Sequence, residues 1–212
     1  MNYKFLFIIG TLFIMVFAVN PGNAVSQERQ SYEALMARVK GGDPTVDFKA
    51  LRIAYTETSL YNPYGGDNEA HQAMFDALKN KQFEKAIEHA TAILNKNYVD
   101  IDAHFVCRIA YREMKNMERH REHHLITKGL IDSILGSGDG MAPETAFVVI
   151  NTGEEYIILN VLGFKAQKQS LMESNGPKYD RMEAIDPKTN QKVELYFNVD
   201  LPYNWLSKKM KK

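Results

Sequence analysis

The stretch Gly136-Ser137-Gly138-Asp139-Gly140 divides the chain into two parts with different hydrophobic periodicity. Before it, apolar residues recur at the three- and four-residue spacing of amphipathic helices, and after it short segments alternate between apolar and polar residues. Three glycines in five residues end a helix and make the start of another costly. We therefore expect an α+β protein, with a helical region over residues 25–135, a hinge over 136–144 and a small α+β region over 145–212.

The first 24 residues are typical of a secretory signal peptide. Lys4 supplies the positive charge, an apolar run from Phe5 to Val19 follows, and Gly22 and Ala24 are small residues at the spacing that signal peptidase recognises. The apolar run is shorter than the roughly 20 residues that a membrane-spanning helix needs. The sequence predicts cleavage after Ala24 and a periplasmic or secreted protein without a stable membrane anchor. An uncleaved anchor is the alternative.

Charge and cysteine content exclude several classes of function. Without the signal peptide, acidic residues slightly outnumber basic ones and no basic face is evident, which disfavours nucleic-acid binding. Cys107 is the only cysteine, so an intramolecular disulfide is impossible. The helical pattern around Cys107 indicates a small buried side chain rather than a nucleophile. No cofactor-binding motif is present, and no cofactor is expected.

The periodicity predicts six helical segments before the hinge, over residues 28–40, 47–57, 67–80, 82–95, 100–115 and 118–135. Asp67 is a candidate N-cap for the third segment, and Asp100 or Asp102 is one for the fifth.

After the hinge, we expect strands over residues 145–150, 166–172, 179–185 and 192–199, and short helices over 154–162 and 202–210. A capping box of Thr152 and Glu155 is expected to begin the first of these helices. The strict alternation from Lys192 to Val199 indicates an antiparallel meander with one buried face. In the last helix, Trp205 and Leu206 are expected to cover the sheet.

The third to sixth helical segments show an internal offset of 34 residues, which is the period of the tetratricopeptide repeat. The stretch "KNKQFEKAIEHATAIL", residues 79–94, resembles the middle of that repeat, with Ala86 and Ala90 where two helices must approach closely. This resemblance implies helical hairpins and protein or peptide binding. The second copy places His120 and His124 at the two alanine positions. We expect these larger side chains to widen the helix packing next to the hinge.

Four stretches carry a second resemblance, which covers most of the chain. They are "DFKALRIAYTET" with "YNPYGG" (47–58 and 61–66), "SGDG" (137–140), "AFVVI" leading to "EEY" (146–156) and "LYFNVD" (195–200). With these stretches the chain resembles an uncharacterised family of small exported proteins from Bacteroidetes, known as a domain of unknown function. The resemblance implies an exported or periplasmic protein and transfers no active-site residue.

The stretch "HREHH", residues 120–124, is the first candidate for chemistry. His120 and His124 share one helix face and are weak candidate metal ligands, although zinc needs a third ligand as well. The order of residues fits neither H-E-x-x-H nor H-x-x-E-H, because Arg121 and Glu122 stand in the wrong places. A metal-dependent periplasmic hydrolase that uses His120 and His124 is the alternative function, and packing or surface roles are favoured.

Three tyrosines, Tyr55, Tyr61 and Tyr64, lie in or beside a loop that contains Pro63 and two glycines. Such tyrosines either form an interaction surface or pack the loop against its neighbours. We retain them as interaction candidates. The sequence favours a non-enzymatic exported module that binds an unknown protein or peptide of the cell envelope, in the seam between the two regions.

Overall fold

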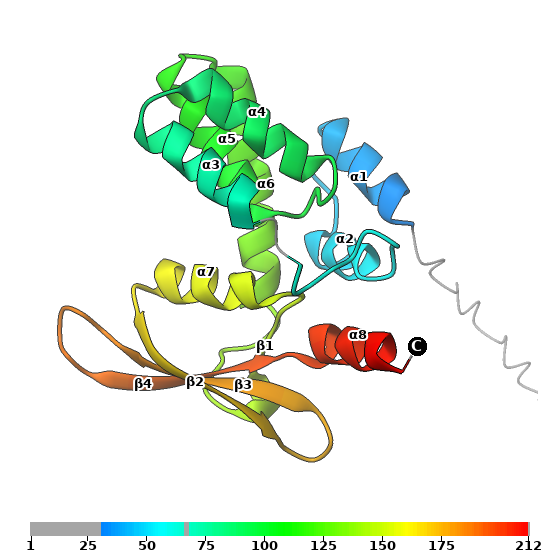
Figure 1. Cartoon of the computed structure of the whole chain (residues 1–212), viewed down its shortest axis with the longest axis vertical. Helices are drawn as coiled ribbons and strands as arrows, with labels where there is room; N and C mark the ends of the chain where they lie inside the picture. The colour runs from blue at the N-terminus through cyan, green and yellow to red at the C-terminus, as the bar shows by residue number, and fades with distance from the viewer. Residues whose placement is uncertain (1–30, 66–67, 212) are drawn as a thin grey trace, which may run out of the picture.

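The computed structural model of the protein describes residues 31–65 and 68–211. A stack of helices forms one end of the molecule and a sheet forms the other, with one helix lying between them (Figure 1). This arrangement confirms the α+β class. The predicted signal peptide lies outside the described residues. Among the described helices, none is both long enough and apolar enough to cross a membrane.

Six helices precede the hinge, close to the predicted segments: α1 (Tyr32–Lys40), α2 (Phe48–Tyr55), α3 (Asn68–Lys79), α4 (Phe83–Leu94), α5 (Ile101–Glu113) and α6 (Met117–Leu135), as far as the described ranges extend. Ser31, Asp47 and Asp100 cap α1, α2 and α5, because each side chain accepts a hydrogen bond from a backbone N–H that has no partner within the helix. The predicted cap Asp67 lies outside the described residues.

The turns that join α3 to α4 and α5 to α6 have the same backbone geometry. Lys81 and Lys115 adopt left-handed conformations, with φ of 57° and 61°. In each turn the next residue donates its N–H to a carbonyl five residues earlier, at 2.8 Å in the first turn and 2.9 Å in the second. This bond closes a Schellman-type helix end. The 34-residue offset seen in the sequence is thus repeated in the backbone of both turns.

The two helical hairpins differ at the positions of the small residues of α4. Ala86 and Ala90 are fully buried, because α4 packs against both α3 and α5. At the equivalent places of α6, His120 is half-buried, His124 is exposed, and His123 is buried instead. His120 and His124 also lie near the start of α6, away from the hinge that follows its end. The prediction that they widen the packing next to the hinge is therefore wrong.

The second region contains a short 3-10 helix (Pro143–Thr145) followed by β1 (Phe147–Val148), α7 (Thr152–Leu162), β2 (Lys165–Glu173), β3 (Lys178–Ile185), β4 (Lys192–Asn198) and α8 (Asp200–Met210). Strands β2 to β4 form the predicted antiparallel meander. Strand β1 adds to it in parallel with β4, so the sheet is mixed and has the order β1-β4-β3-β2. The first strand is shorter than predicted because the N–H of Ile150 bonds to the Glu154 carboxylate instead of to the sheet.

Two further predictions for this region are wrong in detail. Asn151, not Thr152, caps α7, since its side chain accepts the Glu154 N–H at 3.1 Å, and Glu155 is fully buried instead of closing a capping box. Trp205 packs against Tyr61 and Tyr64, and Leu206 remains 37% exposed. The last helix therefore contacts strand β3 of the sheet and also covers the tyrosine loop through Trp205.

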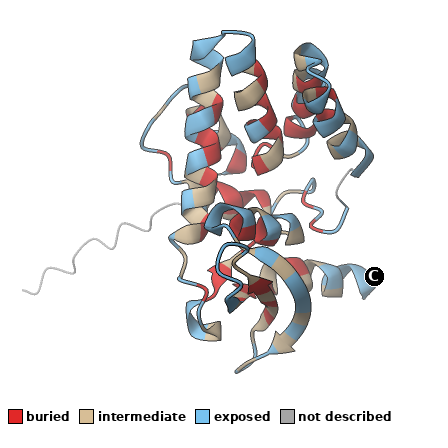
Figure 2. Ribbon diagram, turned by 90° about the vertical axis from the view of Figure 1, so that its left-hand side faces the viewer, coloured by how far each residue is buried: buried red, intermediate tan, exposed pale blue. Residues whose placement is uncertain are grey.

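The core is continuous through the two regions. Figure 2 shows buried residues running from the interior of the helix stack, past α7, to the inner side of the sheet. On the sheet, Met182, Leu195 and Phe197 are buried, and Ile158 and Leu159 of α7 are buried with them. Helix α7 is thus the shared layer between the helix stack and the sheet, and its first turn lies where the two regions meet.

Candidate functional site

A buried ion pair joins the two regions. The side chain of Arg52 on α2 is 1% exposed, and its Nε and Nη2 donate to the two carboxylate oxygens of Glu154 on α7, at 3.0 and 2.5 Å. Arg52 also donates to the Val148 carbonyl and to Ser133 Oγ. A buried pair is favourable only when its remaining hydrogen bonds are satisfied, as they are for this guanidinium. The pair fixes α2, α6, β1 and α7 relative to one another.

Contacts in the core link the stretches on which the family resemblance rests. Arg52 belongs to the first stretch, and Glu154 belongs to the third. The "YNPYGG" stretch is tied in by Tyr61, whose hydroxyl donates to the Ile150 carbonyl at 2.6 Å. The hinge glycine Gly140 accepts the N–H of Tyr196, in the last stretch. A side chain at Gly140 would collide with the neighbouring phenylalanine ring of β1.

The three candidate tyrosines have different roles. Tyr55 and Tyr61 are 6% and 4% exposed, and their rings pack edge to face with centroids 5.7 Å apart. Tyr64 is 50% exposed, and its ring lies tilted beside that of Trp205, with centroids 6.4 Å apart. Tyr55 and Tyr61 thus pack the loop against its neighbours, whereas Tyr64 is exposed and stays an interaction candidate.

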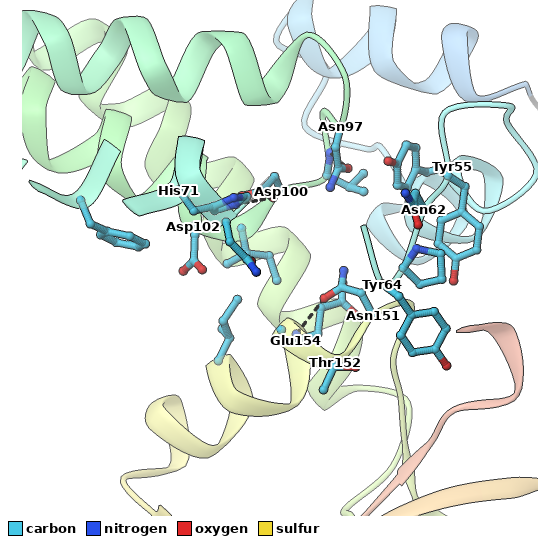
Figure 3. Close-up of a pocket in the computed structure, with 18 residues that line it drawn as sticks. Tyr55, Asn62, Tyr64, His71, Asn97, Asp100, Asp102, Asn151, Thr152 and Glu154 are labelled. Atoms are coloured by element: carbon cyan, nitrogen blue, oxygen red, sulfur yellow. Dashed lines mark hydrogen bonds and ion pairs between the residues drawn. The ribbon is translucent and has the colours of Figure 1, made fainter. Parts of the chain in front are cut away.

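A cavity of about 440 Å³, which we call the seam pocket, opens between the helix stack, the tyrosine loop and the start of α7. Figure 3 shows its three sides: His71, Asp100 and Asp102 on one, Tyr55, Asn62 and Tyr64 on another, and Asn151, Thr152 and Glu154 below. Asn97 lies above them. Aromatic rings, amides and carboxylates therefore face one space that only the tertiary structure creates.

The charges in the seam pocket are unequally neutralised. Glu154 is paired with Arg52, and Asp100 contacts His71 Nε2 at 3.1 Å while it also caps α5. Asp102 is half-buried, and within residues 31–65 and 68–211 its carboxylate has no hydrogen bond or ion pair. Burial, helped by the nearby charge of Asp100, raises the pKa of Asp102 to about 6. The pocket thus holds a carboxylate that favours a cation.

Glu155, next to the ion-paired Glu154, is buried without a counter-charge within the described ranges. It is fully buried between α7 and the sheet, where its Oε2 accepts a hydrogen bond from Gln169 and its Oε1 has no partner among the described residues. Burial and the nearby charge of Asp180 raise the pKa of Glu155 to about 9. Glu155 is therefore protonated at neutral pH. Because Glu155 is fully buried against the sheet, we assign it to the packing of α7.

The histidines of "HREHH" do not come together as a metal site. His120 Nδ1 lies 2.9 Å from the Arg108 carbonyl, and the His120 and His124 rings stack with centroids 6.2 Å apart. Within the described part of the chain, no group of three or more potential ligands is arranged to hold a metal ion. The pair therefore lacks the third ligand that a zinc site needs.

The buried histidines are a different pair, which the sequence did not single out. His104 of α5 and His123 of α6 approach with their Nδ1 atoms 2.9 Å apart, and His104 Nε2 lies 2.9 Å from the Tyr98 carbonyl. Because a carbonyl only accepts, His104 must carry its proton on Nε2, and His123 must then donate from Nδ1. Burial lowers the pKa of His104 to about 4 and that of His123 to about 3. Both are neutral, structural residues.

The sequence missed the main residues of the seam pocket. It placed Asp100 and Asp102 only as candidate helix caps, and it gave no weight to Arg52 or His71. The available signal was an arginine on the apolar side of a short helix, because a buried arginine needs a buried acidic partner. The identity of that partner could not be read from the sequence, since Arg52 and Glu154 are 102 residues apart.

Fold and pocket together define an α+β protein in which a helix stack and a mixed sheet share one core and enclose a polar, partly acidic pocket at their junction. The chain matches the family model described as Domain of unknown function (DUF4919) over residues 23–208, and it belongs to that family. No curated protein matches the chain, and no solved structure matches it.

Proposed function

We propose that the protein is an exported, non-enzymatic module of the cell envelope that binds a protein or peptide segment in the seam pocket. The observation that carries this proposal is the pocket itself, which lies between two regions and is lined by a half-exposed tyrosine, amides and an unpaired carboxylate. Grooves of mixed aromatic and polar character are typical of recognition surfaces. The resemblance of α3–α6 to tetratricopeptide hairpins supports the same class of function.

The binding role is tested by crosslinking in the native host with a tagged full-length protein, followed by mass spectrometry. A specific partner should be recovered with the wild type and lost with Tyr64→Ala. Tyr61→Ala is a poor probe, because that side chain is buried and its loss would disturb the fold. Tyr156→Ala is the matched control, since Tyr156 is 44% exposed on α7 and lies outside the pocket. Equal recovery with both variants would contradict the proposal.

Export has its own test. Fractionation should place the protein in the periplasm or the medium, and N-terminal sequencing should find a mature chain that begins at Val25. A chain that retains Met1 in the cytoplasm would refute the predicted signal peptide without affecting the pocket.

A further inference from the structure

A second depression, which we call the side groove, adjoins the seam pocket. It has a volume of about 550 Å³ and lies between α3, α5, α6 and α7. The exposed surface of its walls is largely apolar, and the lining residues Phe75, Phe105 and Val161 are 36%, 38% and 48% exposed. Several large apolar side chains exposed around one hollow indicate a site that another molecule covers.

The seam pocket and the side groove adjoin each other. Phe75, Ile101, Asp102 and Ile157 line both of them. Asp102 therefore lies where the two hollows meet, with Tyr64 in the seam pocket and Val161 in the side groove. Its polar part carries amides whose oxygens are already engaged, since Asn97 Oδ1 accepts the Val99 N–H and Asn151 Oδ1 caps α7. The Nδ2 groups of these amides are thus donors suited to peptide carbonyls.

The distribution of charge decides what kind of peptide fits. Asp102 lies at the junction of the two hollows and, among the described residues, has no hydrogen-bonding or ionic partner, whereas Glu154 and Asp100 are paired with Arg52 and His71. In the side groove, Lys128 and Asp132 pair with each other. Arg108 lies over the Phe105 ring, 4.9 Å from its centroid. Asp102 thus places a carboxylate without an ion pair where the two hollows meet, with an apolar wall beside it. The Arg108 cation on that wall has no carboxylate partner among the described residues, so the negative charge lies at the junction and a positive charge lies in the side groove.

We propose that these two adjoining hollows bind one extended peptide, in which a lysine or arginine side chain lies against Asp102 and a neighbouring aromatic or aliphatic side chain packs against Phe75, Phe105 and Val161. This inference rests on the proposed binding function and specifies its ligand. A half-buried carboxylate without a partner gains a charge-assisted hydrogen bond from the basic group. The apolar wall supplies the burial of hydrophobic surface.

Four end-capped, fluorescein-labelled peptides test the proposal by fluorescence anisotropy: Gly-Arg-Gly-Leu-Phe-Gly, the same peptide with glutamine or glutamate in place of arginine, and Gly-Arg-Gly-Ser-Ser-Gly. The first peptide should bind wild-type protein about fivefold more tightly than its glutamine version, the increment expected of one partly buried charge pair. Asp102→Asn should abolish this difference without changing the affinity of the glutamine peptide. Phe105→Ser should weaken both, because it removes the apolar wall.

Glu84→Gln, an exposed charge removal on α4 outside both hollows, is the control and should change nothing. Circular dichroism checks that each variant is folded, and Val161→Ser is a second apolar variant should Phe105→Ser unfold. Absence of binding, equal binding of the arginine and glutamine peptides, or an unchanged preference in Asp102→Asn would overturn the proposal. So would a dimer in sedimentation that Phe105→Ser disrupts, since a second copy would then fill the groove.

The two hypotheses fail separately. If crosslinking recovers a partner that depends on Tyr64 and the peptides do not bind, the ligand class is wrong and the binding function stands. If the peptides bind as expected and no partner is recovered, the ligand chemistry holds and the envelope partner is refuted.

Discussion

The helix stack, α3–α6, and the junction around α7 are stabilised in different ways. In the stack, small apolar residues such as Ala86 and Ala90 let neighbouring helices approach, and the contacts are between segments close in the chain. At the junction, ionisable residues distant in the chain meet in the core, with Arg52 and Glu154 paired and the protonated Glu155 beside them. A buried charge needs a hydrogen-bonding or ionic partner, whereas a buried apolar side chain does not. Substitutions at the junction should therefore lower the free energy of unfolding more than substitutions elsewhere.

The largest effect is expected from breaking the buried ion pair. Arg52→Met leaves the Glu154 carboxylate buried without its counter-charge and should lower the free energy of unfolding by about 4 kcal/mol. Urea denaturation monitored by circular dichroism measures this change. The control is Arg119→Met, which removes an exposed pair with Glu122 and should cost less than about 1 kcal/mol. Equal losses in the two variants would show that the junction is no more sensitive than the surface.

Substitution of the adjacent Glu155 should raise the free energy of unfolding instead of lowering it. The pKa of Glu155 is raised to about 9, so the folded state keeps a proton that the unfolded state releases above its ordinary pKa. The residue therefore lowers stability progressively as the pH rises from about 4.5 to 9. Glu155→Gln should raise the free energy of unfolding by about 3 kcal/mol at pH 7.5 and leave it unchanged near pH 4. A loss of stability at pH 7.5 would contradict the assigned protonation.

The stack carries its own buried polar pair, His104 and His123, and it should respond to acid. Their pKa values are lowered to about 4 and about 3, so only the unfolded state takes up protons as the pH falls below 6.5. Their contribution is complete above about pH 7.5 and is lost on acidification. In the Glu155→Gln background, stability should fall by about 2 kcal/mol between pH 7.5 and 5.5, after the smaller opposing effect of Asp102.

Nuclear magnetic resonance provides an independent check of the histidine pair. The ring signals of His104 and His123 should stay unchanged down to pH 5, and their nitrogen shifts should report a proton on Nε2 of the first and on Nδ1 of the second. Titration of either ring near pH 6.5 would contradict the buried, neutral pair.

The smallest changes in the free energy of unfolding are expected from substitutions at the helix ends, where the junction has a glycine and the helix stack has a lysine in the left-handed conformation. Gly163 ends α7 with φ of 81°, and no atom lies near enough to contact an added Cβ, so Gly163→Ala should cost about 1 kcal/mol through the backbone alone. Lys81 holds a left-handed conformation without being glycine, so Lys81→Gly should be neutral or slightly stabilising. Thermal unfolding distinguishes the two, and Gly163→Asn should recover part of the loss because asparagine tolerates this conformation.

Much of the secondary structure could be predicted because its causes are local. Caps such as Asp47 and Asp100 follow from residue type and position, and the alternation in β4 places Leu195 and Phe197 on the buried side. Helices α1–α6 precede the hinge glycines, and all the strands of the described residues follow them. The candidate site was predicted only in part. The tyrosine loop was identified, and Tyr64 does line the pocket, but Asp102, His71 and Phe105 were missed.

By itself, the sequence determined the α+β class, the order of the elements and the repeated helix turns at Lys81 and Lys115, because hydrogen bonds within a few residues and hydrophobic periodicity decide these features. Only the tertiary structure decided that β1 runs parallel to β4, that Arg52 reaches Glu154, and that Asp102 is left without a partner among the described residues where the two hollows meet. Those features depend on which segments, distant in the chain, pack against one another and exclude water. The free energy of a buried charge depends on the groups around it, and these are set only by the folded structure.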